Sequence, residues 1–167
     1  MGVCTAATMP KKDPTDIEQV KKKARDFDIT SLKMHTSHGN LANGALMRCM
    51  PLIVYGHKLP PDQLVLLMRE DASLTHANAI GYYANATYAI AVQHLLNTQK
   101  STKKREEKMK EAYNQAKTWL RTKIDDYAAR TVYEWLRKAM NKDDLSNPIS
   151  LEGFIGHAFQ RSFYHLY

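Results

Sequence analysis

The spacing of apolar residues constrains the fold of this chain more than any other feature of its sequence. Between residues 78 and 97, apolar and small residues recur every three or four positions, as in Ile80, Tyr83, Ala84, Thr87, Tyr88, Ala91 and Leu95. This spacing places them on one side of an α-helix, and the small side chains allow neighbouring helices to approach closely. We find no β-strand alternation and no internal repeat, so the sequence predicts an all-α fold.

Proline, glycine and capping residues predict where the other helices begin and end. These helices are expected at about residues 13–27, 45–54, 60–76, 101–140 and 150–167. We expect Pro51 to bend the second and Ser150 to cap the last, and we expect the segment 101–140 to break near Asp125-Asp126 or Ala129. Several connections are short, which favours an orthogonal or antiparallel helical bundle.

The length of 167 residues suits one domain. We expect residues 1–12 to form a flexible tail and residues 13–167 to form a single helical domain. No apolar stretch approaches the roughly 18 residues of a membrane span. The chain starts Met1-Gly2 but has Ala6 where a myristoylation motif needs Ser or Thr. With only Cys4 and Cys49, both expected to be reduced, the sequence predicts a cytoplasmic protein without a membrane partner.

The chain is basic, with a formal net charge of +7 and a pI near 9.4. Its lysines cluster at residues 21–23 and 100–110, in helical segments that also contain glutamate. We interpret both clusters as solvated helix faces. Binding of nucleic acid through the lysine-rich segment 100–123 is a less favoured alternative.

Common catalytic and metal-binding motifs are absent from the sequence. There is no phosphate-binding glycine-rich loop, no CxxC, no HExxH and no nucleophile elbow. The acidic pairs Asp125-Asp126 and Asp143-Asp144 are adjacent residues, whose side chains point about 100° apart on a helix, so neither pair alone makes a metal clamp. None of the seven histidines has a partner at a metal-ligand spacing. We therefore assign no catalytic residue and no metal ligand.

Two polar segments are candidates for a binding site. The first, residues 37–48, contains Asn43 and Gly44 at the start of an apolar helix, with Arg48 one turn later. A helix start attracts phosphate or carboxylate, and the Arg48 guanidinium can pair with either. The second, residues 71–78, contains His76 between two apolar helices, where its ring can donate to phosphate or ribose oxygens. A structural ion pair for Arg48 and a structural role for His76 are the alternatives.

Together these segments resemble two ordered motifs of the ADP-ribosylglycohydrolase family. The run Asn43-Gly44-Ala45-Leu46-Met47-Arg48 is similar to the family's Asn-Gly-x-x-Met-Arg element, and Leu74-Thr75-His76 is similar to its Leu-Thr-His element. One helix-length unit separates them, as in the family. The resemblance covers about residues 37–166 and is weakest across residues 100–123.

The resemblance implies an all-α fold with a cleft that holds ADP-ribose and two divalent ions, usually Mg²⁺. The metals position substrate and water for attack at the anomeric carbon of ADP-ribose. By this resemblance Asn43, Gly44, Arg48 and His76 are expected to bind substrate, and ADP-ribose or an ADP-ribosylated group is the expected partner.

The sequence departs from the family in its metal motifs. We find no Gly-Asp, Thr-Asp-Asp or Asp-x-Asp-Thr element, and Leu41-Ala42 stands where other members have Gly or Ser. We therefore expect an incomplete family domain that does not hydrolyse the ADP-ribose linkage by itself. A non-catalytic protein that binds ADP-ribose or a protein partner is the alternative.

Overall fold

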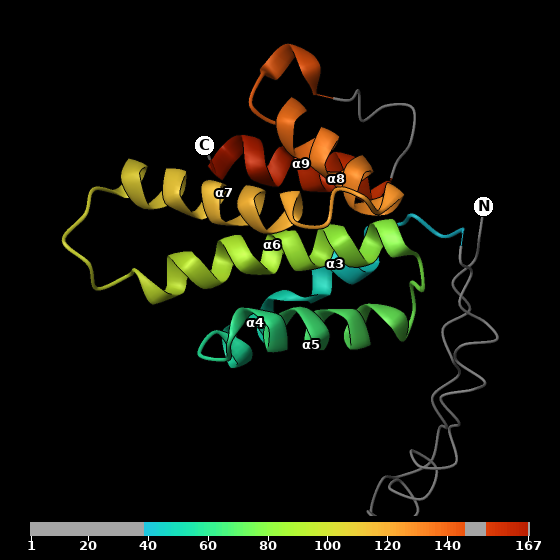
Figure 1. The fold of residues 1–167 in the computed structure, drawn as a ribbon, viewed down its shortest axis with the longest axis horizontal. Coiled ribbons are helices and arrows are strands. Elements are labelled where there is room, and N and C mark those ends of the chain that lie inside the picture. Colours follow the sequence, from blue (N-terminus) through green and yellow to red (C-terminus); the bar gives the residue numbers. More distant parts are fainter. Residues whose placement is uncertain (1–38, 146–152, 167) are drawn as a thin grey trace, which may run out of the picture.

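A computed structural model describes residues 39–145 and 153–166 of the chain. The described residues form seven α-helices and one 3-10 helix (Figure 1). In chain order these are α3 (Gly44–Arg48), α4 (Met50–Gly56), α5 (Pro61–Ser73), α6 (Ala79–Asn97), α7 (Arg105–Arg121), α8 (Tyr127–Lys138), η1 (Lys142–Asp144) and α9 (Ile155–Leu166). The prediction of an all-α fold is confirmed. The predicted tail, the predicted helix at 13–27 and the Ser150 cap lie outside the described residues.

Helix α6 is the centre of the bundle and contacts each of the other six α-helices named above. It starts where the side chain of Asn78 accepts a hydrogen bond from the backbone N–H of Ile80 at 2.8 Å. Ala84, Ala86 and Ala89 on this helix are fully buried. Their small side chains let α5 and α7 pack on either side of α6, both antiparallel to it (Figure 1). The helix predicted at 78–97 is therefore confirmed.

The predicted break in the segment 101–140 lies between α7 and α8. The Asp126 side chain caps α8 by accepting a hydrogen bond from the N–H of Ala128 at 2.8 Å. Its second carboxylate oxygen accepts a 2.9 Å hydrogen bond from the hydroxyl of Tyr83 on α6. Asp126 thus links the start of α8 to α6, the central helix of the bundle.

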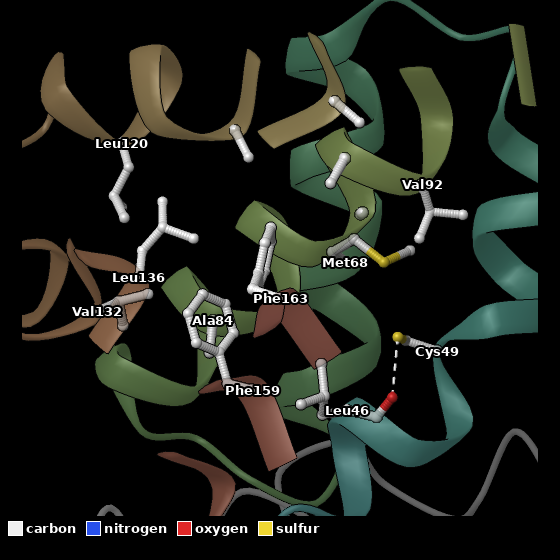
Figure 2. Close-up of a cluster of buried hydrophobic side chains, with 14 of the residues drawn as sticks. Leu46, Cys49, Met68, Ala84, Val92, Leu120, Val132, Leu136, Phe159 and Phe163 are labelled. Atoms are coloured by element: carbon white, nitrogen blue, oxygen red, sulfur yellow. Dashed lines mark hydrogen bonds between the residues drawn. The ribbon is translucent and has the colours of Figure 1, made fainter. Parts of the chain in front are cut away.

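The single helix predicted at residues 45–54 is wrong, because the chain forms two helices that meet at Cys49. Pro51 lies in the first turn of α4. Proline has no N–H to donate to the preceding turn, and its ring crowds the carbonyl four residues earlier. At the junction, the buried thiol of Cys49 donates to the carbonyl of Leu46 at 3.0 Å (Figure 2). The proline therefore ends one helix and begins the next.

The last helix begins at Ile155, several residues after the predicted start. Gly153 has φ of 80°, a left-handed conformation that favours glycine. Next to Gly153, Ala42 and Phe154 form an isolated antiparallel β-bridge. Its two backbone hydrogen bonds run from Asn43 N to Gly153 O at 2.7 Å and from Ile155 N to Leu41 O at 2.8 Å. The bridge ties the segment before α3 to the start of α9.

Aromatic and aliphatic side chains from all seven described α-helices contribute to the core, and Figure 2 shows part of it. The rings of Phe159 and Phe163 lie 4.7 Å apart between centroids. Leu120 of α7 and Leu136 of α8 are fully buried in the same cluster. Among the described helices, none is long and apolar enough to cross a membrane.

Candidate functional site

The two polar segments singled out in the sequence meet in the structure. Gly44, at the start of α3, lies against the ring of His76, which follows α5. A methyl group on Gly44 would lie 3.1 Å from Cε1 and 3.4 Å from Nε2 of that ring. Glycine therefore allows an approach that a larger residue would hinder. Asn43 precedes α3, and its backbone N–H bonds to Gly153 across the bridge described above.

Arg48 fastens α3 to the end of α5. Its Nη2 donates to the backbone carbonyl of Asp71 at 2.6 Å, and its Nε lies 3.3 Å from the Asp71 carboxylate. Asp71 lies in the last turn of α5, where the helix dipole disfavours a negative charge. The positive guanidinium of Arg48 compensates that negative charge. Arg48 therefore forms a structural ion pair, which the sequence analysis gave as the alternative to a direct role in binding.

A third bond connects Arg48 to His76 through Thr75. Arg48 Nη1 donates to Thr75 Oγ1 at 2.5 Å, and Thr75 Oγ1 lies 2.7 Å from His76 Nδ1. A guanidinium can only donate, so Thr75 accepts from it and has its own hydrogen to give to Nδ1. That arrangement leaves the imidazole proton on Nε2, beside Gly44. Arg48 thereby positions the ring of His76.

The imidazole of His76 is held in its neutral form. The side chain is buried, and burial, followed by the positive charge of Arg48, lowers its pKa from the ordinary value of 6.5. At neutral pH the ring is therefore a hydrogen-bonding group without charge.

This shift predicts a pH dependence. Between the unfolded pKa near 6.5 and the lower folded pKa, the unfolded chain binds more protons at His76 than the folded chain does. The contribution of His76 to the free energy of unfolding should therefore fall as pH drops through this window. We expect an NMR titration of the His76 ring to show a midpoint below 6.5. A midpoint at or above that value would contradict the described environment.

His76 also lines a cavity of about 340 Å³, which we call the His76 cavity. It is lined by the end of α5, the α5–α6 junction, the first turn of α6 and Asp126. The rings of Tyr82 and Tyr83 lie 4.8 Å apart there, and the Arg69 guanidinium lies 5.7 Å from the Tyr82 ring centroid. The cavity thus combines aromatic faces, a cation and a carboxylate.

The predicted site residues divide into two groups. His76 lines the cavity, whereas Asn43, Gly44 and Arg48 are not among its lining residues. Gly44 contacts the His76 ring, and Arg48 bonds to Thr75, which in turn bonds to that ring. Both residues therefore affect the cavity only by positioning His76.

Sequence reasoning missed Arg69, Tyr82, Tyr83 and Asp126 as members of this cavity. In the sequence analysis, Asp126 is treated only as half of an acidic pair, but its carboxylate accepts a hydrogen bond from the Tyr83 hydroxyl. Burial, then the hydrogen bond to Asp126, raises the pKa of Tyr83 to about 12, so its hydroxyl stays protonated. The signal in the sequence is the helix break predicted near Asp125-Asp126.

A profile of the ADP-ribosylglycohydrolase family matches residues 9–167 of the chain. The chain belongs to the ADP-ribosylglycohydrolase family. Searches of curated proteins and of solved structures gave no match. In this ADP-ribosylglycohydrolase the Asn-Gly-x-x-Met-Arg segment and the Leu-Thr-His segment contact each other.

The divalent ions expected for an ADP-ribosylglycohydrolase do not fit the described residues. Within residues 39–145 and 153–166, no group of three or more His, Cys, Asp or Glu side chains is arranged to hold a metal ion. In the His76 cavity, the Asp126 carboxylate already accepts hydrogen bonds from Tyr83 and Ala128. We therefore derive no reaction step through Mg²⁺.

Proposed function

We propose that this ADP-ribosylglycohydrolase binds the ADP-ribose unit of its substrate in the His76 cavity. The observation that carries the proposal is the contact between Gly44 and the His76 ring at the wall of that cavity. It brings together two segments that resemble substrate-facing motifs of the family. The volume of about 340 Å³ lies within the range of small-molecule sites.

The groups that line the cavity suit the parts of ADP-ribose. The Arg69 guanidinium offers the forked donor geometry that pairs with phosphate oxygens. The Tyr82 and Tyr83 rings provide faces for a base or a sugar. His76, held neutral, offers a hydrogen bond without the cost of burying a charge, and the Asp126 carboxylate can accept from ribose hydroxyls.

We further propose that the described residues bind ADP-ribose without hydrolysing its glycosidic bond to a modified group. Activation of water in this family needs metal-held carboxylates, and the described part of the chain offers no cluster for them. Carboxylates from elsewhere would be needed to restore that reaction. The alternative is a non-catalytic protein whose role is to bind ADP-ribose or a protein partner.

Titration calorimetry with ADP-ribose, in the presence and absence of Mg²⁺, tests the proposal. We expect saturable binding that does not require Mg²⁺ and no release of ADP-ribose from a modified substrate. Binding that appears only with Mg²⁺ would show that the chain holds the metals itself. Absence of binding, together with salt-sensitive affinity for RNA or DNA, would favour the nucleic-acid alternative.

A matched pair of glycine variants locates the site. In Gly44→Ala the new methyl group displaces the His76 ring by a few tenths of an ångström, and we expect about tenfold weaker binding of ADP-ribose, or about 1.4 kcal/mol. In Gly81→Ala the methyl group lies 3.9 Å from Ile155, an ordinary contact, and binding should not change. Gly81 lies within α6 and its new methyl group meets no close neighbour, so Gly81→Ala should keep or gain stability, and a thermal melt shows that Gly44→Ala is folded. Equal affinity in the two variants would contradict the proposed site.

A further inference from the structure

A second, larger cavity lies on the other side of α6. Its volume is about 520 Å³, it shares no lining residue with the His76 cavity, and we call it the α6–α9 groove. It is formed where the second half of α6 and the first half of α7 extend past the end of α9 (Figure 1). Its lining residues are Met50, Tyr88, Ala91, Val92, Leu95, Leu96, Arg105, Lys108, Met109, Ser162, Phe163, His165 and Leu166.

The walls of the groove are mostly apolar, because one face of α6 consists mainly of apolar residues. On α6, residues 88, 91, 92, 95 and 96 have the spacing of one helix face. Phe163 and Leu166 face them from α9, and Met50 and Met109 add flexible, polarizable side chains. A surface of this kind accommodates a chain of methylene groups.

Two cations line the groove along the first turns of α7. Arg105 and Lys108 are three residues apart, so they lie on one side of the helix. Lys108 Nζ donates to the backbone carbonyl of Ser101 at 2.8 Å. In the part of the chain that the structure describes, neither cation forms an ion pair with a carboxylate. Glu111, farther along α7, is engaged by Lys103 and His94.

We propose that the α6–α9 groove binds a long-chain carboxylate, with its apolar chain between α6 and α9 and its head group at Arg105 and Lys108. The unpaired positive charge selects an anionic head, and the guanidinium matches the two oxygens of a carboxylate. The volume of about 520 Å³ lies within the range of small-molecule sites, and a single alkyl chain matches the mostly apolar walls. This inference does not depend on the ADP-ribose proposal.

Calorimetric titration of the full chain with dodecanoate, below its micelle concentration, tests the inference. We expect saturable binding at one site. Butanoate has the same head but a short chain, and each methylene lost should weaken binding about fourfold. Dodecyltrimethylammonium has the same chain but the opposite charge and should bind at least tenfold more weakly. Equal affinity for the two dodecyl compounds, or no binding of dodecanoate, would overturn the proposal.

Two pairs of variants locate the ligand. Arg105→Gln/Lys108→Gln should weaken dodecanoate binding about tenfold. Lys110→Gln/Arg121→Gln removes the same charge from α7 outside the lining residues and should leave the affinity unchanged. Equal losses in the two double variants would show a non-specific charge effect and contradict the site.

A bulky side chain placed in the α6–α9 groove tests whether the alkyl chain lies between α6 and α9. Ser162 is exposed on α9 and its hydroxyl donates to the Ala158 carbonyl of the same helix, so Ser162→Trp should fold and fill the groove. Thr118→Trp, exposed on α7 outside the groove, is its control. We expect Ser162→Trp to lose binding and Thr118→Trp to keep it, with melting temperatures showing that both are folded. Unchanged binding in Ser162→Trp would overturn the assignment.

Discussion

Replacement of Arg48 by methionine is expected to weaken ADP-ribose binding about tenfold or more and to lower the free energy of unfolding by about 1–3 kcal/mol. Methionine keeps much of the apolar stem but removes the donors to the Asp71 carboxylate, the Asp71 carbonyl and Thr75 Oγ1. Asp71 then keeps its charge at the end of α5 without compensation. His76 loses the group that positions it through Thr75.

Calorimetry and denaturant unfolding measure the two effects in the same variant. The pKa of His76 should also rise in Arg48→Met, because the charge of Arg48 helps to lower it. Arg137→Met is the control, since Arg137 pairs with Glu134 at 3.2 Å on the exposed face of α8. That variant should lose no more than about 0.5 kcal/mol. Loss of stability without loss of affinity would limit Arg48 to a structural role.

Replacement of Phe159 by alanine is expected to lower the free energy of unfolding by about 3–5 kcal/mol. Phe159 is fully buried and packs against Phe163 (Figure 2), and its ring centroid lies 6.3 Å from that of Trp135. Alanine would leave a cavity between α8 and α9 that rigid helices cannot close. For a domain of this size the melting temperature should fall by about 6–20 °C.

Scanning calorimetry checks this result. Tyr127→Ala provides the comparison, because Tyr127 is 74% exposed at the start of α8 and its removal should change stability by about 0.5 kcal/mol or less. A fall of under 2 °C in Phe159→Ala would mean that the helices around Phe159 do not share one cooperative core.

Local chemistry was enough to predict most of the helices. Asn78 and Asp126 have short polar side chains that accept from the amides of a starting helix, and both lie where the sequence predicts a helix start or break. Pro51 shows the limit of this reasoning. Its effect is predicted as a bend, but the structure has two separate helices that meet at the buried Cys49.

The candidate site could be predicted only in part. Gly44 and His76 were found because their motifs resemble those of a family, and the structure adds their contact. The association of Tyr83 with Asp126 joins residues far apart in the chain, and helix packing creates it. Asn85 is a second feature that the sequence does not predict. Its side-chain amide is buried without a hydrogen-bond partner among the described residues. No local pattern predicts a polar group in that position.

Observation of the His76 ring during addition of ADP-ribose tests most directly whether the Gly44 and His76 segments build one binding site. In a heteronuclear NMR titration, we expect the ring resonances of His76 to shift progressively and to saturate at the ADP-ribose concentration at which calorimetric binding saturates. Saturating ADP-ribose binding that leaves the His76 resonances unmoved would place the ligand elsewhere and contradict the proposed site.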